Sequence, residues 1–341
     1  MKIVADDKIP YLKGVLEPYA EVVYRPGRAI AAADVADAEV LLVRTRTRCD
    51  AGLLAGSPVR LVATATIGTD HIDLAWCARH GVEVVSAPGC NAAGVLQWVA
   101  AVLAASFGAS DPASVTVGVV GVGHVGSLVA RYAQAWGFRV LCSDPPREQA
   151  ERLGVAQGYV PLAQLAAESD LVTFHVPFTQ QGTFATCGLG GADFFRALKP
   201  GALVLNASRG GVVDEEVWLA ALAAGRCRAG VDTWAHEPAI DRNLLAAAQF
   251  ATPHIAGYSL QGKANATAAV VRAVARRYGW PLTAWYPAQV QPVERQPIDW
   301  HALCGRIGDY FDIARQSAAL KAEPERFEQF REEYAFREEL F

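Results

Sequence analysis

Three ionisable residues give this chain its clearest chemical signal. Arg209, Glu237 and His254 each follow a run of apolar and β-branched residues that reads as a strand. The carboxyl ends of parallel strands meet at one edge of a sheet, where ligands bind, so we expect the three side chains in one cleft. Arginine can clamp a carboxylate, and histidine can exchange a proton near neutral pH when a glutamate orients it. The set suits hydride transfer at a carbon that carries a hydroxyl group beside a carboxylate.

Each of the three residues also has an ordinary structural interpretation. Arg209 could lie on the surface, Glu237 could belong to a turn with the proline that follows it, and His254 could be a buried histidine. Taken singly, these interpretations are the more frequent ones. We prefer the catalytic interpretation because all three residues hold equivalent strand-end positions in a chain that also carries a nucleotide-binding signal.

That second signal is a glycine-rich turn, GVGHVG, which matches the pattern GxGxxG. A strand is predicted before it at residues 115–120 and a helix after it at residues 127–136. The first glycine allows a tight turn, the second lets the backbone approach a pyrophosphate, and the third permits close helix–strand packing. The phosphates would sit on the N-terminus of the following helix. The residues assigned to this turn are Gly121, Gly123, His124, Val125 and Gly126.

The choice between NAD and NADP depends on the end of the next predicted strand, where Asp144 stands. A carboxylate there accepts hydrogen bonds from ribose hydroxyls and repels a 2′-phosphate, which favours NAD. Arg147, three residues further on, could bind a 2′-phosphate and is a mild argument for NADP. The sequence therefore predicts an NAD site.

Strand-like runs alternate with helical segments along most of the chain, which predicts βαβ units and parallel sheets. One series fills the N-terminal part and a second begins near residue 115. Residues 95–106 and 267–278 read as long helices that could connect two domains if the chain leaves the first and later returns. Residues 10–19 are expected to form an amphipathic helix.

The C-terminal part changes in character. Residues 287–297 are rich in Pro, Gln and Val and read as a linker, after which the chain is helical and charged. Two interpretations of this end stay open: a helix packed on its own chain, or a dimerisation arm. Its aromatic residues at near-helical spacing are Phe327, Phe330, Tyr334 and Phe336.

Composition limits the class of protein. The 341 residues suggest about two domains, and a hydrophobic fraction of 52% allows a sizeable core. A net charge of −4 provides no general attraction to nucleic acid or to an anionic membrane. The longest apolar stretch is too short to span a bilayer, and the first residues lack a signal-peptide pattern. Seven scattered cysteines form no CxxC pair, so we expect no metal site and a cytoplasmic protein with reduced thiols.

Four segments, in order, resemble the D-isomer-specific 2-hydroxyacid dehydrogenase family: GVGHVG, ASRGGVVDEE, GVDTWAHEP and TPHIAG. Others resemble one branch of it that acts on a phosphorylated acid: VRTRT, TATIGTDHID, APGCNAAGV and SDPPR. The resemblance implies two doubly wound parallel-sheet α/β domains, a Rossmann NAD domain inserted into a flavodoxin-like substrate domain. The implied substrate domain is 1–94 with 258–287, the NAD domain is 95–257, and a shortened C-terminal dimerisation domain is 288–341.

The resemblance also implies roles for single residues. Arg209 would hold the substrate carboxylate, His254 would accept the hydroxyl proton, and Glu237 would support His254. Asp232 would hold the nicotinamide carboxamide. The cofactor would further contact Val176, Ala207, Ser208, Arg209 and Gly257, and the substrate Thr45, Thr66 and Tyr258.

A phosphorylated substrate needs cations. Arg44, Arg46 and Arg48 alternate with threonines, so on a strand end they would share one face and could bind the phosphate. A solvated basic edge strand is the alternative interpretation. Arg337 is a further candidate near the end of the chain.

These observations favour a homodimeric enzyme that oxidises a small phosphorylated 2-hydroxy acid with NAD. Two alternatives remain: a dehydrogenase for another D-2-hydroxy acid such as glycerate or phosphoglycerate, and a regulatory protein that binds NAD without turnover. The complete set of Arg209, Glu237 and His254 argues against the second alternative.

Overall fold

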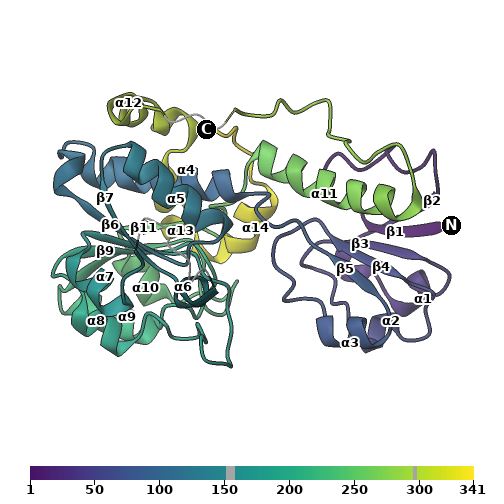
Figure 1. Ribbon diagram of the computed structural model, residues 1–341, viewed down its shortest axis with the longest axis horizontal. Helices are drawn as coiled ribbons and strands as arrows, with labels where there is room; N and C mark the ends of the chain where they lie inside the picture. Colours follow the sequence, from purple (N-terminus) through teal and green to yellow (C-terminus); the bar gives the residue numbers. More distant parts are fainter. Residues whose placement is uncertain (151–157, 295–297) are drawn as a thin grey trace. The chain divides into compact units, whose positions relative to one another are not determined.

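The computed structural model describes residues 1–150, 158–294 and 298–341. Residues 151–157 and 295–297, the latter in the expected linker, lie outside the described residues. The chain divides into two compact units, Met1–Asn91 with Ser259–Pro292 and Ala92–Tyr258 with Val293–Phe341 (Figure 1). Most of the segment expected as a separate C-terminal domain is thus grouped with the second unit.

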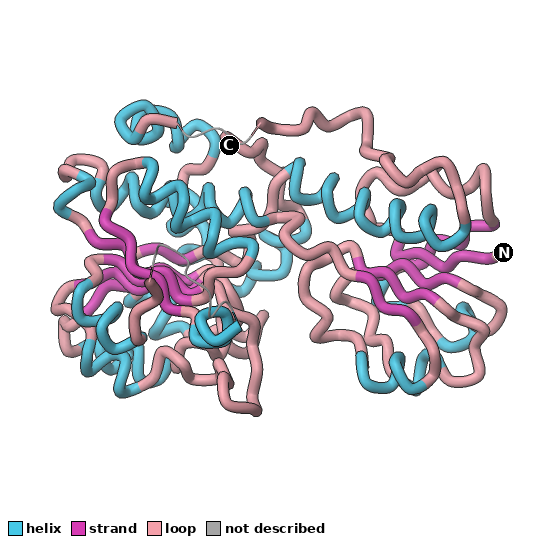
Figure 2. The backbone as a smooth tube through the Cα atoms, viewed as in Figure 1, coloured by secondary structure: helices cyan, strands magenta, loops and turns pink. Residues whose placement is uncertain are grey.

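The first unit is built on a five-stranded parallel sheet with the order β2-β1-β3-β4-β5. The strands are β1 (Lys2–Asp6), β2 (Glu21–Arg25), β3 (Val40–Val43), β4 (Leu61–Thr64) and β5 (Glu83–Val85). Its helices are η1 (Gly27–Ala29), α1 (Ala32–Val35), α2 (Ala51–Leu54), α3 (Leu74–Arg79) and α11 (Leu260–Tyr278). Both faces of the sheet are covered, because α11 lies on one face and α1 to α3 lie on the other (Figure 2).

The alternation of side chains along β3 explains these two layers. Val40 and Leu42 point into a cluster with Val270 and Val274 of α11, whereas Leu41 points into a cluster on the opposite face. All of them are fully buried. A parallel sheet covered on both faces reads as a continuous apolar run, as β3 does.

The helix expected at residues 10–19 is a wrong prediction, because this segment forms a series of turns. Tyr11 and Gly14 have φ angles of 61° and 85°. These left-handed conformations are incompatible with a continuing right-handed helix. Leu12 and Leu16 are nevertheless fully buried, so the apolar spacing reflects packing of the turns on the sheet.

The second unit contains a six-stranded parallel sheet with the order β11-β10-β9-β8-β6-β7. The strands are β6 (Thr116–Val120), β7 (Arg139–Ser143), β8 (Leu171–Phe174), β9 (Ala202–Asn206), β10 (Cys227–Val231) and β11 (Phe250–Ala251). The first helices are α4 (Ala92–Phe107), η2 (Pro112–Ser114), α5 (His124–Ala135), α6 (Pro145–Ala150), α7 (Leu162–Glu168), α8 (Ala192–Ala197), α9 (Glu215–Ala223) and α10 (Arg242–Ala247). The doubly wound α/β fold predicted from the sequence is confirmed.

The C-terminal helices of this unit are α12 (Trp300–Tyr310), α13 (Ile313–Ala322), η3 (Pro324–Arg326) and α14 (Phe327–Glu332). Phe327 is only 1% exposed and packs in one core cluster with Leu320 of α13. Phe341 is also 1% exposed, with its ring 5.0 Å from that of Tyr132. The segment therefore packs on its own chain, and its last helix ends before Tyr334.

Within the described residues, no helix combines the length and the apolar character that a membrane span requires. The same residues contain no group of three His, Cys, Asp or Glu side chains arranged to hold a metal ion.

Candidate active site

His254 and Glu237 form a hydrogen-bonded pair in the second unit. The Nδ1 atom of His254 lies 3.0 Å from Oε1 and 2.8 Å from Oε2 of Glu237. A carboxylate only accepts hydrogen bonds, so Nδ1 carries the proton and Nε2 is the nitrogen that can take another. The His254 side chain is 31% exposed and that of Glu237 17%. The pair thus has the arrangement of a general base held by a buried carboxylate.

Several groups keep Glu237 ionised. Burial raises the pKa of its carboxyl, but the charge and hydrogen bond of His254 lower it more, with help from the Trp234 N–H and Arg331. The Trp234 N–H donates to Oε1 at 2.9 Å. The net pKa is below the usual value, so Glu237 acts as an acceptor toward His254.

His254 is presented by a loop that Asp232 organises. One carboxylate oxygen of Asp232 accepts from the Thr252 hydroxyl at 2.6 Å and from the N–H groups of Ile255 and Ala256 at 2.8 and 3.0 Å. Asp232 is 1% exposed, and burial raises the pKa of this carboxyl. His254 itself has a φ of 55°, a conformation that a non-glycine residue keeps only when its surroundings enforce it. A contact of Asp232 with nicotinamide stays a prediction.

Arg209 lies in the turn that follows β9. The side chain of Asn206 fixes this turn, because its Nδ2 donates to the Arg209 carbonyl at 2.9 Å and its Oδ1 accepts from the Ser208 hydroxyl at 2.7 Å. A side chain on Gly210 would collide with the backbone of Trp234, so the turn packs directly on the loop that leads to Glu237. Since β9, β10 and β11 are adjacent, the loops that carry Arg209, Glu237 and His254 follow neighbouring strand ends, and a common cleft for the three side chains stays a prediction.

The glycine-rich turn between β6 and α5 has the shape that a dinucleotide requires. Gly121 has a φ of 84°, and a side chain on it would collide with Val176. A side chain on Gly126 would collide with the Gly121 carbonyl, whereas a side chain on Gly123 would meet nothing within 4 Å. The space above Gly123, which precedes the first residue of α5, fits a pyrophosphate on the helix N-terminus.

Asp144 ties this turn to the end of β7. Its Oδ2 accepts from the Val122 N–H at 2.7 Å, and its Oδ1 accepts from the Arg147 N–H at 3.1 Å. The remaining proposed cofactor contacts follow strands of the same sheet or the loop after β11. They are His124, Val125, Val176, Ala207, Ser208 and Gly257.

Two proposed substrate contacts lie in the first unit and one in the second. The Thr66 hydroxyl is 2.7 Å from that of Thr64, which is 3.2 Å from Nε2 of His71. Thr45 is exposed in the turn after β3, and Tyr258 follows the His254 loop. Contacts of these three hydroxyl groups with substrate stay predictions.

The shared strand face expected for Arg44, Arg46 and Arg48 is a wrong prediction. The strand β3 ends at Val43, and the chain then turns. The Arg44 guanidinium contacts both oxygens of the fully buried Asp6 at 3.1 Å. Turn geometry and the buried carboxylate, rather than strand alternation, therefore set the direction of Arg44.

Arg337 has no exposed position from which to bind a phosphate, in contrast to the expectation. It is 8% exposed and donates to four backbone carbonyls and to a tyrosine hydroxyl. The carbonyls are those of Gly94, Ile255, Ala256 and Tyr258. Three of them belong to the loop that follows His254, so Arg337 stabilises that loop.

Arg331 was not expected from the sequence and lies beside the candidate catalytic pair. Its Nη1 is 3.7 Å from Oε2 of Glu237 and 3.0 Å from Oε1 of Glu328. Glu328 and Arg331 are three residues apart on α14, a spacing visible in the sequence. No local signal could have identified Glu237 as the other partner.

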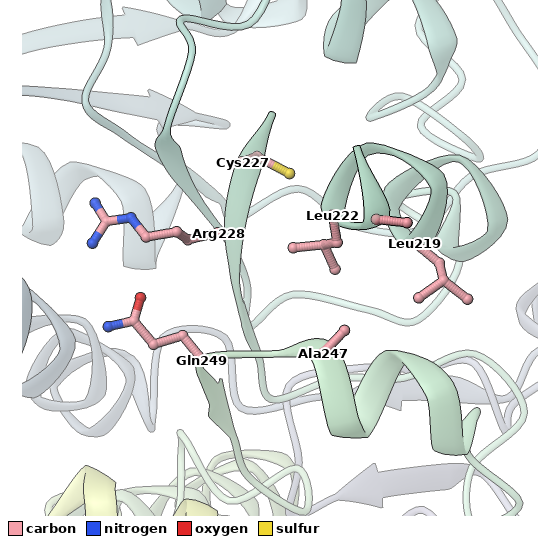
Figure 3. Close-up of a pocket in the computed structure, with 7 residues that line it drawn as sticks. Leu219, Leu222, Cys227, Arg228, Ala247 and Gln249 are labelled. Atoms are coloured by element: carbon pink, nitrogen blue, oxygen red, sulfur yellow. The ribbon is translucent and has the colours of Figure 1, made fainter. Parts of the chain in front are cut away.

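A hollow of about 360 Å³ lies elsewhere on the second unit, between α9, α10 and the start of β10 (Figure 3). Leu219, Leu222, Cys227 and Ala247 give it a largely apolar lining. Cys227 is the first residue of its strand, so the hollow is at the amino edge of the sheet, opposite the edge that carries Arg209 and His254.

Comparisons with known proteins agree with this geometry. A family model described as D-isomer specific 2-hydroxyacid dehydrogenase, NAD binding domain, matches residues 96–256. An erythronate-4-phosphate dehydrogenase of Bacteroides fragilis is 41% identical over 99% of this chain and 97% of its own length. One from Edwardsiella ictaluri is 40% identical over 99% of this chain and 93% of its own length.

Solved structures show the same fold. A D-lactate dehydrogenase from Aquifex aeolicus, complexed with NAD and lactic acid, has a TM-score of 0.68 and 23% identity, covering 86% of this chain and 100% of its own. The TT0316 protein from Thermus thermophilus has a TM-score of 0.68 and 25% identity, covering 82% of this chain and 98% of its own. This chain belongs to the D-isomer specific 2-hydroxyacid dehydrogenase family, in the branch of the erythronate-4-phosphate dehydrogenases, and residues 96–256 are its NAD binding domain.

Proposed function

We propose that this chain oxidises 4-phospho-D-erythronate to (R)-3-hydroxy-2-oxo-4-phosphooxybutanoate with NAD, a step of pyridoxal 5′-phosphate biosynthesis. The observation that carries the proposal is the His254–Glu237 pair, located at the same sheet edge as the Arg209 turn and the glycine-rich turn. The similarity to erythronate-4-phosphate dehydrogenases over nearly the whole chain supports this substrate in particular.

The proposed roles follow from the chemistry of each side chain. Arg209 binds the C1 carboxylate and polarises the C2 oxygen through its N–H groups. Nε2 of His254 accepts the proton of the C2 hydroxyl, and the Glu237 carboxylate stabilises the imidazolium that results. Bound NAD supplies the acceptor for the hydride that leaves C2. Asp144 is proposed to accept from the ribose hydroxyls, and the turn at Gly123 to hold the pyrophosphate.

The substrate residues belong to the same proposal. Thr45, Thr66 and Tyr258 offer hydroxyl groups to the acid, and Arg44 and Arg46 offer positive charge to its phosphate. The contact with Asp6 supports a fixed direction for Arg44, with a side chain that remains 29% exposed.

We further propose that the protein works as a homodimer in the cytoplasm. Each of its seven cysteines lies in the described part of the chain and is a free thiol, as expected for a reducing compartment. Size-exclusion chromatography with light scattering would measure the oligomeric state, and a monomer at micromolar concentration would contradict the dimer.

A substrate panel tests the activity. NADH formation would be followed with 4-phospho-D-erythronate, D-erythronate, D-glycerate and 3-phospho-D-glycerate, with NAD and with NADP. We expect the highest kcat/KM for 4-phospho-D-erythronate with NAD. A preference for an unphosphorylated acid would reject the proposed substrate. Binding of NAD without reduction, even in a single turnover with excess acid, would favour the regulatory alternative.

A further inference from the structure

The last helix of the chain, α14, brings a cation next to the catalytic carboxylate. Oε2 of Glu237 lies 2.8 Å from Nδ1 of His254, and Nη1 of Arg331 approaches the same oxygen at 3.7 Å. The Arg331 side chain is only 15% exposed, so water screens this interaction less than on an open surface. The helix α14 that carries Arg331 is anchored by Phe327, which is buried in the core of the second unit.

We propose that Arg331 is a positioning residue for the dehydrogenase reaction, which holds the Glu237 carboxylate ionised and directed at His254. The inference rests on the acid–base role of that pair, which is part of the proposed function. It assigns to the C-terminal segment a part in catalysis within its own subunit, separate from any part in dimerisation.

The charges around the pair favour this role. The groups that face Glu237 are His254, Arg331 and, from α9, the carboxylate of Glu215. Glu215 accepts from the Ala235 N–H at 2.6 Å, and burial raises its pKa, with His236 and Asp241 as its other titratable neighbours. Arg331 brings a positive charge to these carboxylates, and it also interacts with Glu328 and Tyr258.

A second arginine fixes the same region in place. Nη1 of Arg337 donates to the carbonyls of Ile255 at 3.1 Å and Tyr258 at 2.9 Å, and its guanidinium lies 4.3 Å from the ring centroid of Phe311. The C-terminal segment therefore holds the loop that carries His254 as well as the carboxylate that orients it. Because packing holds both α14 and the loop that follows His254, it also determines the distance between Arg331 and Glu237.

The test compares Arg331→Gln with Arg331→Lys and with a control on the same segment, Arg326→Gln. Arg326 is bound to Glu323 at the surface and does not contact the catalytic pair. We expect Arg331→Gln to move the acid limb of the kcat/KM–pH profile upward by roughly 0.5–1 unit. Without the cation, the His254–Glu237 pair, whose imidazole must be neutral to act as the base, takes up a proton at a higher pH. Below that limb kcat/KM would fall roughly 3- to 10-fold. Arg331→Lys should have a profile close to that of the wild type, and Arg326→Gln should match the wild type.

A second readout needs no substrate. Carbon-13 NMR titration of the Glu237 carboxyl in the NAD-free protein should show its pKa raised in Arg331→Gln and largely restored in Arg331→Lys. If Arg331→Gln fails to fold, the test uses Glu328→Gln instead. Arg331 then has one acidic partner fewer and interacts more strongly with Glu237. The acid limb of the kcat/KM–pH profile and the pKa of Glu237 should therefore both move downward.

The outcomes separate this inference from the proposed function. A folded Arg331→Gln protein with a lower melting temperature but an unmoved pH profile and an unmoved Glu237 titration would overturn the positioning role. A wild-type protein that oxidises none of the 2-hydroxy acids would reject the proposed function instead, and the Glu237 titration would still decide the effect of Arg331.

Discussion

The imidazole Nδ1 of His254 lies within hydrogen-bond distance of both carboxylate oxygens of Glu237, at 3.0 and 2.8 Å, although the two residues belong to different loops of the sheet edge. This relationship fixes the tautomer of the histidine and leaves Nε2 available to a substrate hydroxyl.

Replacing His254 by alanine removes the proposed acid–base group. We expect His254→Ala to lower kcat by about 10²–10⁴-fold, because a positioned general base contributes roughly that factor. NAD affinity, measured by calorimetry, should change little. His301→Ala, at an exposed position of α12, is the matched control and should keep full activity. Normal turnover by His254→Ala would refute the assigned mechanism.

Glu237 should make stability depend on pH in the acid range. Its carboxyl has a lowered pKa in the folded protein, so it adds stability above its ordinary value of 4.5 and loses this contribution as pH falls through the folded-state value. We expect Glu237→Gln to reduce the free energy of unfolding by about 1–3 kcal/mol at pH 7. The difference in the free energy of unfolding between Glu237→Gln and the wild type should become smaller below pH 4.5. Urea unfolding at several pH values measures it, with the exposed Glu332→Gln as control.

His175, which follows β8, should also make stability depend on pH, and its effect should begin at a higher pH than that of Glu237. Burial lowers the pKa of its imidazole from 6.5 to about 3, so the folded protein keeps the ring neutral while the unfolded chain takes up a proton. Stability should therefore fall by about 1.4 kcal/mol for each pH unit below roughly 6.5. We expect His175→Gln to remove this dependence of stability on pH. His301 is exposed, so His301→Gln should keep it. Equal slopes in all three proteins would contradict the burial of a neutral ring.

Two glycines of the cofactor turn should respond differently to alanine. Gly123→Ala adds a methyl group where no protein atom lies within 4 Å, so the melting temperature should stay unchanged while NAD binds more weakly. Gly126→Ala forces a methyl group against the Gly121 carbonyl and should destabilise the fold by about 1–3 kcal/mol or more. Calorimetry of NAD binding and thermal unfolding separate the two effects. Unchanged NAD affinity in Gly123→Ala would argue against pyrophosphate at this turn.

The basic turn after β3 allows a test of phosphate recognition. We expect Arg46→Gln to raise the KM for 4-phospho-D-erythronate roughly 10- to 100-fold, the loss typical of a charge-assisted hydrogen bond. Arg48→Gln is the control, because its side chain is 85% exposed and bound to Asp50. Equal KM values for Arg46→Gln and wild type would exclude Arg46 from the phosphate site.

Much of the fold and the core of the candidate site could be predicted from sequence because their signals are local. Apolar runs placed the strands, and the glycine-rich turn needed only its neighbouring strand and helix to be interpreted. Arg209, Glu237 and His254 were found by one general rule, that the carboxyl ends of parallel strands meet at one sheet edge.

Local patterns failed where packing or turn geometry decided the outcome. The apolar spacing of residues 10–19 predicted a helix, but positive φ angles at Tyr11 and Gly14 make it a series of turns. The alternation of Arg44 and Arg46 predicted a shared strand face, but β3 ends at Val43, before either of them.

The sequence by itself determined the chemistry available to this protein: a glycine-rich dinucleotide turn, an arginine after a neighbouring strand and a histidine with an acidic partner. Only the tertiary structure decided what surrounds that partner. Arg331 reaches Glu237 because Phe327 and Leu320 are packed into the core of the second unit, and Arg337 reaches the carbonyls after His254 for a similar reason. Contacts between residues so far apart in the chain depend on the burial of whole helices, which no short sequence pattern encodes.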